Sequence, residues 1–264
     1  MALDSCLKQD TFISLPTGFG KSAIFQCAPV CHDFMRGTEN TCHKSLVIVI
    51  LPLKSLALDQ MDRAKELGLE AGLVMNDFIE DGTENLSTGM YSILFASPEV
   101  LLSTKGREAL QVGQVYDRIC GIFVDESHCV VKWGHSSGHT NAFRKFYGML
   151  AELRSVIKPS TPLIAITATA TTQVRAAIVK SLGMHNVALI HASPTVDNIK
   201  HVVVETRLKD PSEIFSWLCE DLKQKHGKME RVIIFCQSRK DCSELNIQQP
   251  SSNSLLEIFQ HVSH

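Results

Sequence analysis

The sequence has 264 residues, of which 44% are hydrophobic, and its 26 Lys and Arg nearly balance its 28 Asp and Glu. This size accommodates one large or two ordinary domains, and the net charge of −2 excludes a globally basic surface, so a nucleic-acid partner would need a local basic groove. No apolar run approaches the length of about 18 residues needed for a membrane span, and the first ten residues do not resemble a signal peptide. The nine scattered cysteines indicate reduced thiols rather than a disulfide framework.

The first predicted elements surround a glycine-rich turn. Residues 12–15 read as a short buried strand, and residues 23–25 begin a helix-like stretch. Between them lie Pro16, Thr17, Gly18, Phe19, Gly20, Lys21 and Ser22. Glycines let backbone N–H groups turn toward phosphate oxygens, a lysine adds positive charge, and a serine hydroxyl can ligate Mg²⁺. The full pattern has a glycine five residues before Gly20, where this chain has Leu15, yet the strand–turn–helix order still predicts a nucleotide site.

Thiols and imidazoles gather just after this turn. They are Cys27, Cys31, His32, Cys42 and His43. Their spacing is not that of a zinc site, so they are predicted to be core or loop side chains.

Apolar runs then alternate with helical patterns along the chain. The predicted strands are residues 46–51, 72–75, 91–96, 119–124 and 163–166, and the predicted helices are 56–67, ended by Gly68, and 171–182, ended by Gly183. Residues 76–89 are polar and loop-like. Fully apolar strands alternating with helices predict an α/β fold, a parallel sheet with helices on both faces, whose ligands lie at the carboxyl ends of the strands.

Two carboxylates follow the strand 119–124 directly. Asp125 is placed to hold Mg²⁺, and Glu126 to orient and deprotonate an attacking water. A solvated pair of acids is the structural alternative.

Six motifs in order make the pattern specific. They are the segment Pro16 to Ser22; Pro52-Leu53-Lys54-Ser55-Leu56 with Asp59-Gln60; Ala96-Ser97-Pro98-Glu99; Asp125-Glu126-Ser127-His128; Trp133-Gly134-His135; and Thr167-Ala168-Thr169-Ala170-Thr171. Together they resemble the RecQ-like group of superfamily 2 ATP-dependent DNA helicases. The resemblance implies a RecA-like P-loop sheet in residues 1–200 and the start of a second RecA-like lobe in residues 201–264.

The resemblance also implies an activity: an ATP-dependent 3′→5′ DNA helicase that uses Mg²⁺, with single-stranded or tailed duplex DNA as partner. DNA repair and recombination, and a nuclear location in a eukaryote, follow from the family alone. A truncated ATP- and nucleic-acid-binding fragment with little or no unwinding is the alternative.

Residue roles follow motif by motif. Lys21 would bind the β/γ-phosphates, Ser22 and Asp125 would hold Mg²⁺, and Glu126 would be the general base. A further set would contact nucleic acid or couple it to ATP: His128, Trp133, Phe143, Arg144, Thr167 and Thr169. Structural alternatives stay open for several of them, namely a core or surface aromatic for Trp133, a buried histidine for His128, and a strand end or helix cap for the two threonines.

The chain departs from the family pattern in two places before its C-terminal segments. Seven residues, 136–142, separate His135 from Phe143 and Arg144, which are therefore read as displaced equivalents of an Asp-Phe-Arg continuation. Gln9 lies too close to the first strand to read adenine.

The C-terminal segments are predicted as a strand at 201–205, a helix at 211–225 and a strand at 231–236. Residues 232–236 with Ser238 and Arg239 resemble motif IV, and no counterparts of motifs V and VI follow.

Two other enzyme classes were weighed. Gly134-His135-Ser136-Ser137-Gly138 matches the G-x-S-x-G turn of α/β-hydrolases, but residues 130–133 make a poor preceding strand. A DEAD-box RNA helicase is the nearer alternative, and it is disfavoured by Ser127-His128 and by residues 129–135.

Overall fold

The computed structural model divides the chain into two compact units, Met1–Thr195 and Val196–His264. The residues that it describes are 2–37, 44–75, 91–134, 142–193, 199–200, 202–206, 210–225, 232–236, 238, 240, 243 and 257–259. Each unit is described by itself. The domain boundary predicted at residue 200 stays a prediction.

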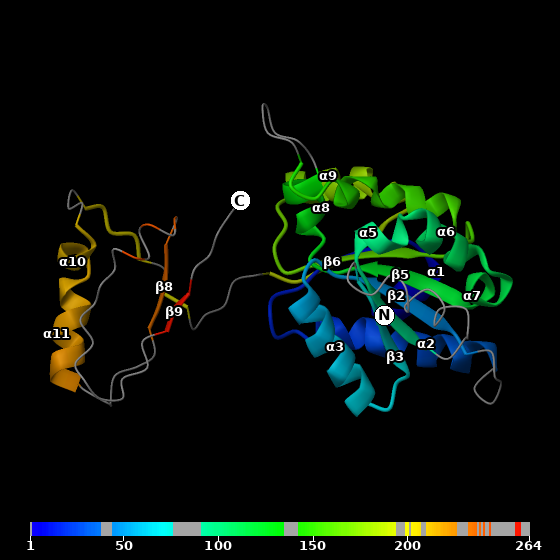
Figure 1. Ribbon diagram of the computed structural model, residues 1–264, viewed down its shortest axis with the longest axis horizontal. Coiled ribbons are helices and arrows are strands. Elements are labelled where there is room, and N and C mark those ends of the chain that lie inside the picture. The colour runs from blue at the N-terminus through cyan, green and yellow to red at the C-terminus, as the bar shows by residue number, and fades with distance from the viewer. Residues whose placement is uncertain are drawn as a thin grey trace. The chain divides into compact units, whose positions relative to one another are not determined.

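The first unit is built on a seven-stranded sheet in which every neighbouring pair is parallel. From one edge to the other the strands are β3 (Ala71–Val74), β4 (Ile93–Ala96), β2 (Leu46–Ile50), β5 (Ile119–Val124), β6 (Leu163–Thr167), β1 (Thr11–Ser14) and β7 (Ala188–His191) (Figure 1). The predicted α/β fold is thereby confirmed.

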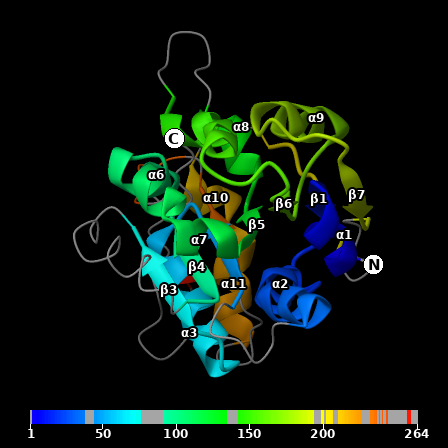
Figure 2. The same ribbon diagram turned by 90° about the vertical axis from the view of Figure 1, so that its right-hand side faces the viewer.

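Helices cover both faces of this sheet. One face carries α1 (Ala2–Lys8), α2 (Lys21–Arg36) and α3 (Lys54–Glu66); the other carries α5 (Pro98–Leu101), α6 (Thr104–Gln111), α7 (Gly113–Arg118), α8 (His128–Gly134), the 3₁₀ helix η2 (Lys145–Ser155) and α9 (Thr172–Ser181) (Figure 2). Alternate residues of each strand enter opposite cores: Ile48 lies in one and Val49 in the other. None of the described helices is long and apolar enough to cross a membrane.

Aromatic packing fixes α2 against the sheet. The fully buried ring of Phe25 meets the rings of Phe95 and Phe123 edge-on, each at a centroid distance of 6.1 Å. Such pairs contribute about 0.5–1.5 kcal/mol each beyond the area that they bury. The N-terminus of α2, which begins at Lys21, is therefore held at the carboxyl end of β1.

Most predicted elements of the first unit are present, with bounds that differ by a few residues. Residues 130–133, judged unsuitable as a strand, lie in helix α8. The edge strand β7, the helices α1, α6, α7 and α8 and the 3₁₀ helix η2 were not predicted. Residues 202–205, predicted to be a strand, are not a strand: Val203 and Val204 are 91% and 79% exposed, and the described part of the chain provides no strand to pair with them.

The second unit is small. It contains α10 (Pro211–Ile214), α11 (Ser216–Lys225) and two parallel strands, β8 (Ile233–Phe235) and β9 (Glu257–Phe259). The helix predicted over residues 211–225 is interrupted at Phe215. Among the described residues of the second unit, Leu218 on α11 and Ile234 on β8 are the buried hydrophobic ones. Its assignment as the start of a second RecA-like lobe stays a prediction.

Candidate functional site

The glycine-rich turn joins β1 to α2 and depends on two left-handed residues. Gly18 has φ +87° and Gly20, the N-cap of α2, has φ +72°. A Cβ at either position would meet no atom within 4 Å, so the requirement for glycine lies in the backbone conformation and not in space. The turn thereby leads directly into the N-terminus of α2, where the first N–H groups of a helix have no carbonyl partner four residues back and can bind an anion.

The Lys21 ammonium folds back over this turn. Its Nζ donates hydrogen bonds to the carbonyl oxygens of Leu15 and Pro16, both at 3.1 Å. These are weak neutral acceptors for a full positive charge. The lysine is therefore held at the mouth of the turn, and none of the carboxylates in the described part of the chain is bonded to it.

Asp125 and Glu126 follow β5 on the same edge of the sheet. The Asp125 N–H continues the ladder by donating to Ile50 O at 3.0 Å. Glu126 then takes the left-handed conformation, with φ +47°, and its N–H donates to the Asp125 carboxylate at 2.9 Å. A glutamate in this conformation is strained, and such strain is characteristic of functional sites.

A polar chain links Glu126 to the end of β6. His128 Nδ1 lies 3.2 Å from Glu126 Oε2 and 3.2 Å from Thr167 Oγ1. Thr167 is fully buried, and its hydroxyl oxygen also accepts from the Thr169 N–H at 3.2 Å. The structure thus brings together four residues that the sequence analysis had named.

The two carboxylates differ in proton affinity. Burial raises the pKa of Asp125 from its usual 3.8 to about 6, and the positive charge of Lys21 partly opposes that rise. The hydrogen bond with His128 lowers the pKa of Glu126, again with help from Lys21. Glu126 is therefore held in the form that accepts a proton, whereas Asp125 needs a cation to stay ionised at low cost.

A cavity of about 360 Å³ lies beside His128 and Thr169, at the ends of β1, β6 and β7. Its lining comprises Ser14, His128, Lys132, Ala168, Thr169, Ala170, Thr171, Val174 and His191. Sequence reasoning missed Ser14, Lys132 and His191. For Ser14 and His191 the signal was their position at the ends of β1 and β7, and for His191 it was hidden because β7 itself was not predicted. Lys132 lies one turn after His128 on α8, a helix that was not predicted.

Aromatic side chains gather where α8 meets η2. The Trp133 ring packs edge-on against Phe143 at 5.8 Å and against Tyr147 at 5.9 Å. Tyr147 is fully buried and Trp133 half-buried, whereas Phe143 is 58% exposed. A Cβ on Gly134 would lie 2.4 Å from the Gly148 nitrogen, so α8 and η2 approach this closely only because both positions are glycine.

Arg144 ties this aromatic group to two other segments. Its guanidinium makes a bidentate pair with Glu99, with Nε–Oε1 at 2.9 Å and Nη2–Oε2 at 2.7 Å, and Nη1 donates to Pro52 O. The guanidinium carbon also lies 5.0 Å from the Tyr147 ring centroid. Because the guanidinium N–H groups are already bonded to Glu99 and Pro52, Arg144 is arranged to position the segments after β2, β4 and α8 rather than to bind a phosphate.

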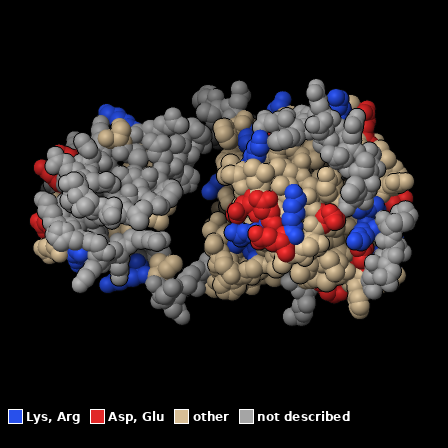
Figure 3. Space-filling view, turned by 60° about the horizontal axis from the view of Figure 1, so that its bottom comes forward, with Lys and Arg blue, Asp and Glu red and all other residues tan. Residues whose placement is uncertain are grey.

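The surface gives no sign of a continuous basic stripe on the one face that Figure 3 presents, where described Lys and Arg side chains are interspersed with Asp and Glu. Opposite charges also pair within helix α3, where an Arg63 nitrogen lies 3.2 Å from an Asp59 carboxylate oxygen. Any nucleic-acid contact on this face would therefore rest on local groups, as the net charge predicted.

The remaining sequence candidates have mixed outcomes. Cys27 is exposed and Cys31 half-buried on α2, so Cys27 is not a core thiol, and within the described residues no three His, Cys, Asp or Glu side chains could share a metal. Cys42, His43, His135, Ser136 and Arg239 lie outside the described residues. The hydrolase interpretation is wrong in its required strand, because α8 occupies that position.

Comparison with known proteins adds independent findings. The family profile "DEAD/DEAH box helicase" matches residues 1–177. Among curated proteins, the RecQ-like DNA helicase blm-1 of Caenorhabditis elegans is 30% identical over 97% of this chain, and the ATP-dependent DNA helicase RecQ of Haemophilus influenzae is 28% identical over 88%. The chain spans only 25% and 33% of the lengths of these two relatives.

Solved structures agree on the fold. The helicase MrfA, in a structure bound to DNA and AMPPNP, superposes with a TM-score of 0.64 at 15% identity, over 92% of this chain and 34% of MrfA. Dbp5 of S. cerevisiae, bound to RNA and ADP BeF3, gives a TM-score of 0.61 at 18% identity, over 90% of this chain and 55% of Dbp5. At these identities the likeness shows a RecA-like α/β fold.

Proposed function

The chain belongs to the DEAD/DEAH box helicase family, and on that premise we propose that it is the ATP-binding part of a RecQ-like 3′→5′ DNA helicase. The observation that carries the proposal is the convergence of Lys21, Asp125 and Glu126 at one edge of the sheet, with His128 bridging Glu126 to Thr167. Each of these residues has a task in triphosphate hydrolysis.

Binding of the triphosphate is assigned to the glycine-rich turn. The N–H groups at the start of α2 and the Lys21 ammonium supply donors and positive charge for the β- and γ-phosphates. Phosphate oxygens are stronger acceptors than the carbonyls of Leu15 and Pro16, so Lys21 exchanges these partners for the ligand at little cost.

The donor set suits a magnesium ion. Ser22 offers a hydroxyl beside the turn, and Asp125 offers a carboxylate whose pKa is raised by burial, so a cation beside it would favour its ionised form. The ion, when bound, neutralises charge that develops on the phosphates. Glu126, kept deprotonated by His128, accepts the proton of the attacking water.

Coupling to nucleic acid is assigned to the aromatic group. The exposed ring of Phe143, which packs against Trp133, offers a stacking surface, and such stacking is worth about 1–3 kcal/mol per base. His128 and Thr167 connect the base Glu126 to the segment after β6. DNA is proposed as the partner, and a nuclear location in a eukaryote stays a prediction from the family.

One experiment tests this proposal. ATP turnover is measured alone, with single-stranded DNA and with single-stranded RNA, and unwinding is measured on duplexes with 3′ or 5′ tails. We expect stimulation by DNA and opening of the 3′-tailed duplex. Stimulation by RNA alone would favour an RNA helicase, and nucleotide and DNA binding without turnover would favour the alternative of a binding fragment.

A further inference from the structure

A second cavity lies at the opposite, amino edge of the sheet. Its volume is about 430 Å³, within the roughly 300–1,000 Å³ typical of small-molecule sites. It is lined by Pro29, Val30, Asp33, Phe34, Lys44, Gly68, Leu69, Glu70 and Ser92. These residues come from α2, from the turn after α3 and from the starts of β2 and β4, so none belongs to the site described above.

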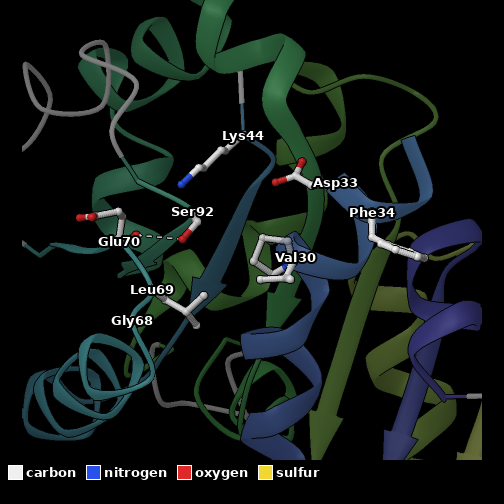
Figure 4. A pocket seen from close by; sticks show the side chains of 9 residues that line it. Val30, Asp33, Phe34, Lys44, Gly68, Leu69, Glu70 and Ser92 are labelled. Carbon is white, nitrogen blue, oxygen red and sulfur yellow. Dashed lines mark hydrogen bonds between the residues drawn. The ribbon is translucent and has the colours of Figure 1, made fainter. Parts of the chain in front are cut away.

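The lining has an apolar floor and a polar side. In Figure 4 the Lys44 ammonium and the Asp33 carboxylate reach toward the space beside Val30 and Leu69, whereas Glu70 and Phe34 point away from it. Ser92 completes the polar side, and its hydroxyl donates to Glu70 O at 3.2 Å. Within the described residues no ion pair is found for the Lys44 ammonium.

The charges of the cavity are not equivalent. Asp33 is 7% exposed, accepts hydrogen bonds from Ser45 N at 2.9 Å and Ser45 Oγ at 2.5 Å, and interacts electrostatically with the buried Arg118. Its charge is therefore largely compensated inside the protein. The Lys44 ammonium is the charge that remains for a ligand, and it favours an anionic group.

Helix α2 connects this cavity to the phosphate-binding turn. The helix begins at Lys21 and its sixteen residues span about 24 Å, so the cavity contacts the same helix that carries Lys21 and Ser22. Pro29 lies inside the helix, is buried, and lines the cavity. Because proline has no N–H, the Phe25 carbonyl lacks its helical hydrogen bond, which makes this the point where α2 bends most easily.

We propose that this cavity is a regulatory site for a small amphipathic organic anion, with a ring-sized apolar body on Val30 and Leu69 and a carboxylate or sulfonate on Lys44. A ligand packed against Pro29 changes the bend of α2 and with it the position of Lys21. The binding site stands apart from ATP, whereas its effect on the phosphate-binding turn rests on the proposed function.

The binding test uses 8-anilinonaphthalene-1-sulfonate as the probe, followed by fluorescence. Lys44→Glu should weaken probe binding at least about 10-fold, as expected from reversing the one charge that meets the sulfonate. Lys105→Glu, the same change on the exposed face of α6, should leave the affinity within about 2-fold. N-phenyl-1-naphthylamine, which has the rings without the sulfonate, should bind both variants alike. Equal affinity of the sulfonate probe for the two variants would overturn the site.

The coupling test measures binding of radiolabelled ATP by equilibrium dialysis with and without the probe. We expect a change in ATP affinity of about 5-fold or more, the lower range of allosteric coupling. Pro29→Ala, which restores the N–H to the helix, should keep probe binding and lose most of this effect. An unchanged ATP affinity with the probe bound would overturn the coupling. Failure of the wild-type chain to bind ATP would contradict the proposed function and the coupling together, while the probe titration would still decide the site.

Discussion

The two edges of the sheet treat buried charge in opposite ways. At the amino edge, Asp10 accepts hydrogen bonds from Leu163 N and His185 N, both at 2.8 Å, and forms an ion pair with Arg154. At the carboxyl edge, Asp125 is equally buried but, among the described residues, accepts one hydrogen bond, from the N–H of its neighbour Glu126. The buried carboxylate of Asp10 thus joins strands, whereas that of Asp125 stays available for a ligand.

Backbone strain does not follow this division. Among the described residues, the two non-glycine residues with positive φ are Glu126, at the carboxyl edge, and Asn186, just before β7 at the amino edge. The contrast between the two edges therefore rests on their buried charges. If this contrast is correct, substitutions at the carboxyl edge should damage activity more than stability, and those at the amino edge the reverse.

The largest effect is expected for Glu126→Gln. The amide cannot accept a proton from water, so ATP turnover should fall about 10²–10⁴-fold, while the affinity for ATP changes little. Turnover by single-cycle kinetics and ATP affinity by calorimetry measure the two quantities. Glu108→Gln, on the exposed surface of α6, is the matched control and should behave as the wild type. Normal turnover in Glu126→Gln would remove the assigned base.

Asp10→Asn should produce the largest loss of stability, about 3 kcal/mol. Both carboxylate oxygens of Asp10 accept hydrogen bonds, but the side-chain NH₂ of asparagine can only donate. Whichever oxygen it replaces, the NH₂ faces a backbone N–H or Arg154, and these buried donors lose their acceptor. Urea denaturation measures the change in the free energy of unfolding. A loss below about 1 kcal/mol would show that the amino edge does not depend on this carboxylate.

Asp125→Asn should do the opposite and stabilise the protein at pH 8 by about 1–3 kcal/mol when no nucleotide or metal is present. The raised pKa means that the folded state binds the proton more tightly than the unfolded state, so ionisation of Asp125 lowers stability as the pH rises from about 4 to about 6, and the whole cost is present above pH 6. The gain should therefore shrink as the pH falls from 7 to 4, because Asp125 of the wild type is then protonated first in the folded state and next in the unfolded state. Denaturation of both proteins across this range measures the difference, and a pH-independent difference would contradict the assignment.

Arg144 is the exception that tests the comparison, because it lies at the carboxyl edge and its charge is already paired with Glu99. A double-mutant cycle with Arg144→Lys and Glu99→Gln should give a coupling energy of about 1–2 kcal/mol, since the bidentate pair is mostly shielded from solvent. Urea denaturation of the two single variants and the double variant supplies the values. A coupling near zero would instead leave Arg144 available for DNA phosphates.

The smallest effect concerns the glycine-rich turn. Gly20→Ala should cost about 1 kcal/mol of stability, because alanine is strained in the left-handed conformation. Gly113→Ala is the control: its added Cβ also meets no atom within 4 Å, but its backbone is not left-handed. A loss of the same size in both would show that the left-handed conformation of Gly20 is not the source of the cost.

The sequence predicted those parts of the fold whose signal is local. Residues 119–124 are apolar throughout, and β5 has these bounds. Thr171 and Gly183 bracket a helical pattern, and α9 is capped by the Thr171 hydroxyl, which accepts from Val174 N, and ends before the left-handed Gly183. The order of glycine-rich turn, lysine and strand-end acids likewise located the candidate site.

The remainder depends on contacts between residues distant in the sequence. Glu99 and Arg144 are 45 residues apart, and Asp10 bonds residues more than 140 positions away. β7 has alternating half-buried and exposed residues at a sheet edge, a weaker signal than the fully apolar central strands. No window of the sequence contains such information, so the positioning role of Arg144 and the amino-edge cavity became visible only in the folded structure.

The most direct test of the central claim is calorimetric titration of ATP with Mg²⁺ into the wild-type chain, Lys21→Ala and Lys105→Ala. We expect the wild type and Lys105→Ala to bind ATP with the same affinity. Lys21→Ala should bind ATP at least about 10-fold more weakly, because it removes the only lysine of the turn. Equal affinity of all three proteins would contradict the assignment of the carboxyl edge as the triphosphate site.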